Sequence, residues 1–132
     1  MRKPAQEPAR RTRFLLLLDL FVAGIAGQWR RFEIAEGSMR PTLGSGDWVL
    51  GLTRTRQLRI GDVVVCDHPG RPGFAIVKRI ASIDPTDGSL WLLSDDPTTE
   101  SVDSRSFGTV PTTAVTARLA LRYRPVPPIL IR

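Results

Sequence analysis

The chain has 132 residues, of which 42% are hydrophobic and 24% charged, a composition typical of one folded domain with a modest core. Its net charge of +6 is uneven, because residues 1–31 hold seven basic and two acidic side chains whereas residues 32–132 are nearly neutral. This pattern argues against a nucleic-acid partner and favours attraction of a basic tail to a membrane surface. The single Cys66 and the single His68 exclude a disulfide and a structural zinc site, so we expect no metal and no cofactor.

The first 28 residues comprise a basic tail and an apolar run. Residues 1–13 are polar and contain proline, which predicts disorder. Residues 14–28 predict an apolar helix about 22 Å long, compared with a hydrocarbon core of about 30 Å. Asp19 within this run is costly at the middle of a bilayer. A short or tilted anchor, an interfacial helix and a helix docked on the domain all remain open, and the basic flank favours a membrane-associating helix.

From Trp29 onward, alternating and short apolar runs between turn residues predict β-strands. The expected strands are 31–35, 47–50, 62–66, 74–83, 90–93 and 114–123. Residues 84–88 form a turn that makes a hairpin of the fourth and fifth strands, and residues 94–108 form a polar loop. Cys66 ends an apolar run and is expected to be buried. We therefore predict a mainly β, antiparallel domain over residues 29–132.

The first candidate segment, residues 36–43, reads Glu-Gly-Ser-Met-Arg-Pro-Thr-Leu. Gly37 lets the backbone approach a ligand closely beside Ser38, and Pro41 stiffens the turn behind it. Taken alone, this pattern is equally typical of a plain turn.

The second candidate is a lysine in the longest predicted strand. On a strand, Ile76, Lys78 and Ile80 share one face, and Val77 and Arg79 share the other. If the isoleucine face is the core face, Lys78 is buried, and its pKa of about 10.4 falls by up to about 3–5 units. A neutral amine near pH 7 would then be a general base for a serine hydroxyl. If Val77 faces the core instead, Lys78 lies in solvent, and the strand pattern favours neither orientation.

The third candidate comprises residues 94–97 and 101–108, which are rich in side chains that bond their own backbone and build rigid loops. Asp103 and Arg105 are close enough in sequence to form an ion pair that braces a site. A solvated loop has the same composition, so this segment alone does not decide between the two.

Together and in this order, these segments resemble the type I signal peptidase family. The family's Ser-Met-x-Pro-Thr-Leu motif is matched by residues 38–43, and its Gly-Asp turn with an apolar strand by residues 46–50 and 61–65. Its Val-Lys-Arg-Ile strand is matched by residues 77–80. Its last box, Ser-x-Asp-Ser-Arg-x-x-Gly-x-Val-Pro, is matched by residues 101–111.

The resemblance implies a serine endopeptidase that works through a Ser-Lys dyad. Ser38 would be the nucleophile, within a motif that includes Gly37, Met39 and Pro41. Lys78 would be the general base and then the general acid.

The resemblance also implies supporting roles within the protease domain, residues 29–132. Ser101 would orient the Lys78 amine, and Asp103 and Arg105 would hold the loop that carries Ser101. The substrate would lie extended along a strand edge and add a strand through main-chain hydrogen bonds.

Within this family the chain is most similar to the small nickel-type superoxide dismutase maturation proteases. The similarity lies in residues 65–69, 90–93 and 121–125, and in the lack of a large inserted β domain. It implies removal of an N-terminal leader from a precursor protein, with nickel belonging to the substrate. A membrane-associated location follows, on the cytoplasmic face if the substrate is the dismutase precursor.

Two departures from the family pattern bear on the site. Ser94 and Asp96 replace a Gly and an Asn, which affects the conformation of that loop. Glu36 stands where many export signal peptidases carry a serine hydroxyl that helps hold the oxyanion. The oxyanion hole is therefore expected to use the backbone N–H of Ser38 and of a neighbour.

Two alternative functions remain. A general export signal peptidase uses the same chemistry, although the marginal apolar run counts against it. An alternative of another class is a non-catalytic basic module that binds membranes or nucleic acid, in which Ser38 and Lys78 would be dispensable.

Overall fold

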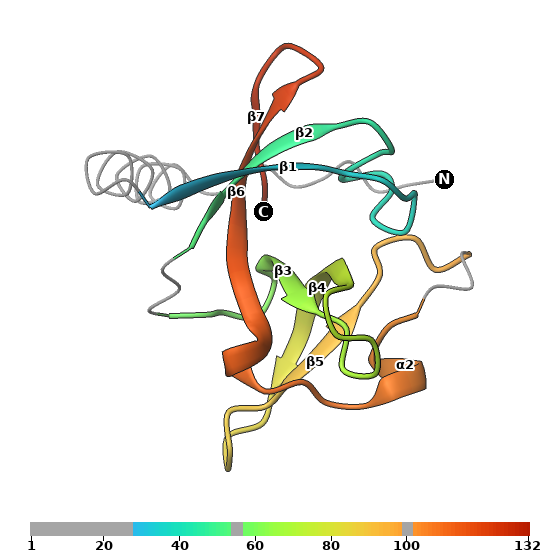
Figure 1. Ribbon diagram of the computed structural model, residues 1–132, viewed down its shortest axis with the longest axis vertical. Coiled ribbons are helices and arrows are strands. Elements are labelled where there is room, and N and C mark those ends of the chain that lie inside the picture. Colours follow the sequence, from blue (N-terminus) through green and yellow to red (C-terminus); the bar gives the residue numbers. More distant parts are fainter. Residues whose placement is uncertain (1–27, 54–56, 99–101) are drawn as a thin grey trace.

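The computed structural model describes residues 28–53, 57–98 and 102–132, which form one seven-stranded antiparallel sheet (Figure 1). The elements are β1 (Trp29–Glu33), β2 (Trp48–Leu52), β3 (Val63–Asp67), β4 (Ala75–Ile83), β5 (Leu90–Leu93), the helix α2 (Ser104–Phe107), the 3-10 turn η1 (Thr112–Ala114), β6 (Val115–Arg124) and β7 (Ile129–Leu130). The predicted mainly β, antiparallel domain is confirmed. The tail at 1–13 and nearly all of the helix predicted at 14–28 lie outside the described residues. Within the described ranges, no helix is long and apolar enough to cross a bilayer.

The long strand β6 joins two halves of the sheet. The strand order is β1-β2-β6-β3-β4-β5, and β7 pairs with the C-terminal part of β6. Figure 1 shows β6 running from the half that holds β3, β4 and β5 to the half that holds β1, β2 and β7. Register shifts interrupt its pairing with both β2 and β3, and such irregularities let a strand bend. The bent sheet has two main hydrophobic clusters and a third, smaller one formed by Leu52 and Ala120.

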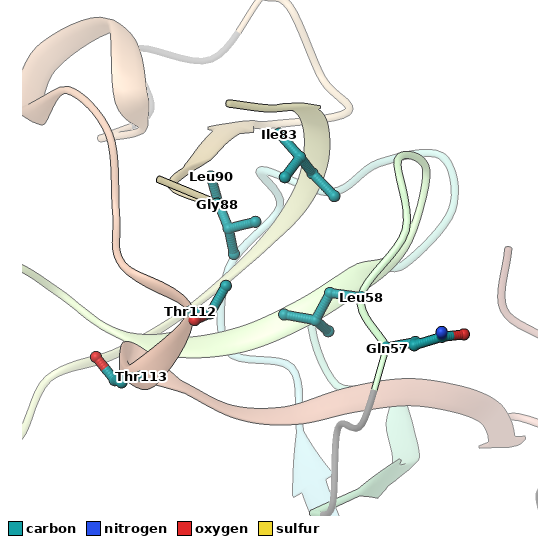
Figure 2. A pocket seen from close by; sticks show the side chains of 7 residues that line it. All are labelled: Gln57, Leu58, Ile83, Gly88, Leu90, Thr112 and Thr113. Atoms are coloured by element: carbon teal, nitrogen blue, oxygen red, sulfur yellow. The ribbon is translucent and has the colours of Figure 1, made fainter. Parts of the chain in front are cut away.

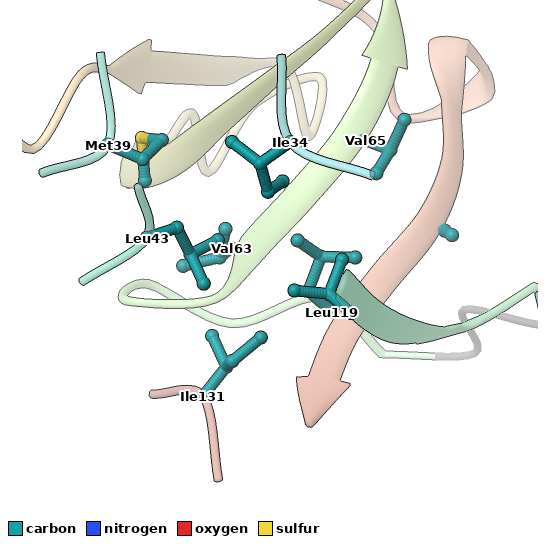
Figure 3. Close-up of a cluster of buried hydrophobic side chains, with 9 residues drawn as sticks. Ile34, Met39, Leu43, Val63, Val65, Leu119 and Ile131 are labelled. Carbon is teal, nitrogen blue, oxygen red and sulfur yellow. The ribbon is translucent and has the colours of Figure 1, made fainter. Parts of the chain in front are cut away.

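Strand β3 separates the two main clusters because both of its faces are buried. Val63 and Val65 face the first cluster, whereas Val64 and Cys66 face the second. A continuous apolar run is typical of a strand covered on both faces, and the predicted burial of Cys66 is confirmed. The first cluster (Figure 3) consists of Ile34, Met39, Leu43, Val49, Val63, Val65, Ala117, Leu119 and Ile131.

Two Gly-Asp turns fix the elements that carry the candidate residues. Gly46 and Gly61 have φ angles of 89° and 95°, a region that favours glycine. The first turn exchanges two backbone hydrogen bonds with Ile34, at 2.7 and 2.8 Å, and the second exchanges two with Ile80, both at 2.8 Å. Ile34 begins the loop between β1 and β2, and Ile80 lies within β4. Turns of the same kind therefore hold in place the loop of residues 34–47, which carries Ser38 and is called the serine loop below, and the strand β4, which carries Lys78.

Two predicted segments need correction. The polar loop predicted at 94–108 contains α2, whose first turn is capped by the Asp103 side chain accepting from the Arg105 N–H at 3.0 Å. The strand predicted at 114–123 is not the last, because β7 follows it and Ile131 then packs into the first cluster. A two-residue strand is too short for hydrophobic periodicity to reveal.

Gly51 in β2 faces the first cluster and leaves no room for a side chain. A Cβ atom at this position would lie 3.0 Å from Ala117 Cβ, 3.0 Å from Phe32 Cε2 and 3.3 Å from Leu119 Cδ2. We predict that Gly51→Ala lowers the free energy of unfolding by about 1–3 kcal/mol through overpacking, measured by urea denaturation. Gly44→Ala is the matched control, because nothing lies within 4 Å of its Cβ position. Equal stability of the two variants would contradict the tight packing at Gly51.

Candidate active site

Strand β4 turns Lys78 toward the interior. The exposed fractions of Ile76, Lys78 and Ile80 are 8%, 3% and 1%, whereas Val77 and Arg79 on the opposite face are half-buried. Ile76 and Ile80 pack into the second cluster. Of the two orientations that the alternating pattern allowed, the structure therefore has the one with Lys78 buried.

Ser38 lies in the loop of residues 34–47, between β1 and β2. The next residue, Met39, and Leu43 are buried in the first cluster (Figure 3), and the Leu43 N–H donates to the Met39 carbonyl at 2.9 Å. On the other side, the Ser38 carbonyl accepts from the Asp96 N–H at 2.9 Å. Hydrophobic anchors and a backbone hydrogen bond therefore hold the hydroxyl in a fixed position.

The other two motif residues lie at the surface of this loop. Gly37 lies beneath the Arg40 side chain, whose Nε would be 3.1 Å from a Cβ atom at residue 37. Pro41 is exposed.

The structure brings together Ser38 and Lys78, which are forty residues apart in sequence. Lys78 Nζ donates a hydrogen bond to Ser38 Oγ at 2.9 Å, and both side chains are buried. Burial lowers the pKa of the Lys78 ammonium, and the carboxylates of Asp103 and Glu36 oppose this shift. A lowered pKa enlarges the neutral fraction of the amine, and the neutral amine can accept a proton from a hydroxyl.

Arg79, on the opposite face of β4, anchors the serine loop. Its Nε and Nη2 atoms each donate to the Asp95 carboxylate at 2.7 Å, in the bidentate geometry that gives strong ion pairs. The same carboxylate accepts from Thr42 Oγ1 at 2.6 Å. Arg79 also donates to the carbonyls of Gly61 and Arg132. This cluster, the Arg79 clamp, ties β4 to the serine loop and to the segment after β5.

The sequence pattern predicted no role for Asp95. Two features of the sequence are consistent with an ion pair at Asp95. Arg79 lies on the face of its strand opposite to Lys78, and two aspartates, Asp95 and Asp96, follow the next strand. Neither feature identifies which acid meets the arginine, because that pairing depends on how the loop after β5 folds.

The third candidate segment is braced as its sequence suggested. Arg105 donates to the Asp103 carboxylate at 3.0 and 2.9 Å, and the Ser94 N–H donates to it at 3.1 Å. Burial alone would raise the pKa of the Asp103 carboxyl, but these hydrogen bonds outweigh burial and lower it. Ser101 lies outside the described residues.

The two departures in the loop after β5 are accommodated by backbone hydrogen bonds. Ser94 uses its N–H to reach Asp103, and Asp96 uses its N–H to reach the Ser38 carbonyl. The Asp96 carboxylate accepts from the N–H and hydroxyl of Thr98, at 2.9 and 2.6 Å. The conformation of this loop therefore directly supports the serine.

A cleft of about 200 Å³ opens beside the Ser38–Lys78 pair. Its walls come from the end of β1, the serine loop, and the beginning of β4. It is lined by Phe32, Glu33, Ile34, Ala35, Glu36, Ser38, Met39, Val65, Phe74, Ala75, Ile76, Val77 and Lys78. The hydroxyl and the amine thus face a space that is mostly apolar.

Two other features lie apart from this cleft. A cavity of about 470 Å³ near the β4–β5 turn is lined by Gln57, Leu58, Ile83, Gly88, Leu90, Thr112 and Thr113, and none of these is a predicted site residue (Figure 2). Cys66 is fully buried, and burial raises the pKa of its thiol to about 12, so it remains protonated. Over residues 28–53, 57–98 and 102–132, no group of three or more His, Cys, Asp or Glu side chains gathers to hold a metal ion.

The Arg79 clamp makes a prediction about stability. Replacing either Arg79 or Asp95 with Ala should lower the free energy of unfolding by about 1–3 kcal/mol, because the remaining partner loses its counter-charge while partly buried. The double variant should lose less than the sum, as measured by a double-mutant cycle in urea. Asp67→Ala is the control, because this exposed carboxylate makes no hydrogen bond to a described residue. Additive losses at Arg79 and Asp95 would show that the two do not act as a pair.

The chain is similar in sequence to known peptidases. Residues 9–87 match the signal peptidase family, peptidase S26. Mitochondrial inner membrane protease subunit 1 of Schizosaccharomyces pombe is 32% identical over 111 residues, covering 68% of this chain and 70% of that protein. The protein of the same name from Xenopus tropicalis is 28% identical over 110 residues, covering 67% of this chain and 65% of that protein. This chain thus spans about two thirds of the length of these relatives. It belongs to the signal peptidase family, peptidase S26.

Proposed function

We propose that this protein is a serine endopeptidase in which Ser38 and Lys78 form the catalytic dyad. The observation that carries the proposal is the 2.9 Å hydrogen bond between a buried amine and a buried hydroxyl at the edge of a cleft. A buried lysine on a structural strand is costly, because burial penalises its charged form. Its pairing with a hydroxyl beside an apolar cleft favours a chemical role for it.

The reaction proceeds in two halves. The neutral Lys78 amine accepts the Ser38 proton while Oγ attacks the scissile carbonyl carbon. The ammonium then gives this proton to the leaving nitrogen, the C–N bond breaks, and an acyl-enzyme remains. Lys78 next takes a proton from a water molecule, whose oxygen attacks the ester. The C–Oγ bond breaks, and the proton returns to Ser38.

The supporting roles are also proposals. The backbone N–H of Ser38 and of a neighbour would hold the oxyanion, because Glu36 offers no hydroxyl at the position where many export signal peptidases carry one. Ser101 would orient the Lys78 amine. Asp103 and Arg105, which form an ion pair, would brace the loop that carries Ser101.

An open strand edge supports an extended substrate. Residues 75–78 of β4 pair with β3, whereas the pairing of β4 with β5 begins only at Arg79. The second edge of residues 75–78 therefore lacks a β5 partner, and these residues line the cleft. A peptide could add there as a strand through main-chain hydrogen bonds, which places its scissile carbonyl near Ser38.

We propose that the substrate is a precursor protein with an N-terminal leader, and specifically the nickel-type superoxide dismutase precursor. Cleavage of precursors is the activity for which signal peptidases are named, and the relatives found by comparison are inner membrane proteases. The apolar run at 14–28 would supply membrane contact, on the cytoplasmic face for a dismutase precursor. The reaction would need no metal or cofactor.

The dyad makes a prediction about activity. Ser38→Ala and Lys78→Ala should each abolish cleavage of the leader-bearing precursor, followed by mass spectrometry of the products. The double variant should be no worse than either single variant, because nucleophile and base act as one unit. Lys78→Met is the control for loss of folding, because methionine keeps a long apolar side chain in the buried position but has no amine; it should also abolish cleavage. Normal cleavage by a folded Ser38 or Lys78 variant would end the dyad hypothesis.

The buried amine makes a prediction about pH. The neutral amine is the reactive form, and burial lowers its pKa, so kcat/KM should rise with pH well below the ordinary lysine value of about 10.4. Glu36→Gln should move this rise to still lower pH, because the Glu36 carboxylate stabilises the ammonium. Profiles of kcat/KM against pH for the wild type and the Glu36→Gln variant give the pH of the rise in each. A profile that is flat up to about pH 9 and rises only above it would show that burial does not activate Lys78.

A further inference from the structure

The cleft beside Ser38 has an unbalanced charge. Three charged residues line it, namely Glu33, Glu36 and Lys78, and the rest are apolar or small apart from Ser38. When Lys78 is neutral, as the proposed mechanism requires, the cleft holds two carboxylates and no cation. An apolar cleft with uncompensated negative charge favours a positively charged substrate group, because its low-dielectric walls strengthen the electrostatic attraction.

Both carboxylates are available to a ligand. Glu33 and Glu36 are exposed, and neither forms a hydrogen bond or ion pair with another described residue. The cations nearest to the two carboxylates along the chain are Arg31, two residues before Glu33, and Arg40, which lies over Gly37; neither lines the cleft. Glu36 interacts electrostatically with Lys78, but neither carboxylate has a described hydrogen-bond or ion-pair partner that a substrate would need to displace.

The position of Glu36 limits where the substrate charge lies. Glu36 precedes Ser38 by two residues, so their Cα atoms are at most about 7 Å apart, and the bend at residues 36–37 shortens this distance. Its carboxylate is close enough to oppose the lowering of the Lys78 pKa. A lysine or arginine side chain on the substrate could reach it from a residue within about two positions of the scissile bond.

We propose that Glu36, assisted by Glu33, is a specificity-determining residue that selects substrates with a basic residue within about two positions of the scissile bond. This inference rests on the proposed peptidase function. Glu36 stands where many export signal peptidases carry a serine hydroxyl that helps hold the oxyanion, so the carboxylate would provide charge selection in place of that contact. An ion pair between exposed groups is worth about 0.4–1 kcal/mol, which corresponds to a preference of about two- to fivefold.

The test uses the full chain and a mixture of random dodecapeptides, with cut sites read by mass spectrometry. Wild type should cut bonds that have Lys or Arg within two positions about two- to fivefold more often than bonds that have Gln there. Glu36→Gln should lose this preference, and Glu36→Lys should favour Asp or Glu instead. The preference should also weaken as salt concentration rises.

Controls separate the inference from the proposed function. Asp87→Asn makes the same change in net charge on the distant β4–β5 turn, and Asn can still accept from the Ser89 N–H, so it should keep the wild-type preference. Ser38→Ala identifies background cleavage. If no cut depends on Ser38, the peptidase proposal fails. If Ser38-dependent cuts show no basic preference, or if Asp87→Asn loses it equally, only the selection by Glu36 is overturned.

Discussion

The amine of Lys78, a residue that is 3% exposed, needs a polar partner, because an unpaired polar group in the interior costs about 1–3 kcal/mol. In this fold the partner is the Ser38 hydroxyl, which comes from a loop on the other half of the sheet. The loop must therefore be held against β4 with little freedom. The buried Met39 and Leu43, and the backbone bond from Asp96, supply that restraint. Much of the surrounding structure serves to keep this one hydrogen bond in place.

Side chains alternate between the two faces of a β-strand, so adjacent residues of β4 can both help to hold the serine loop and supply the amine. Because neighbouring side chains point to opposite faces, Lys78 reaches the cleft while Arg79 reaches the Asp95 carboxylate and the serine loop. One short piece of β4 thus carries both the proposed base and the clamp that positions its partner. A shift of one residue in the register of β4 would exchange these two side chains and destroy both arrangements.

The sequence predicted most strands and the three candidate segments, because periodicity and turn residues are local signals. It left the orientation of Lys78 open, because Ile76 and Ile80 on one face and Val77 on the other are all suited to a core. That choice depends on what lies above each face, which is a property of the folded sheet. The pairing of Arg79 with Asp95 and the pairing of β7 with β6 also depend on the tertiary structure. Nothing in the sequence of either segment identifies the other as its partner.

The same burial has opposite consequences for two neighbouring groups, and this bears on why a serine and an amine are paired here. Cys66 and Lys78 lie on adjacent strands and face the same side, at registers two residues apart. Removal from water penalises the charged form of each, which raises the pKa of the thiol to about 12 and lowers that of the ammonium. The reactive form of a cysteine is the charged thiolate, whereas the reactive form of a lysine base is the neutral amine. A buried site of this kind therefore suppresses thiol chemistry and favours an amine that activates a neutral hydroxyl.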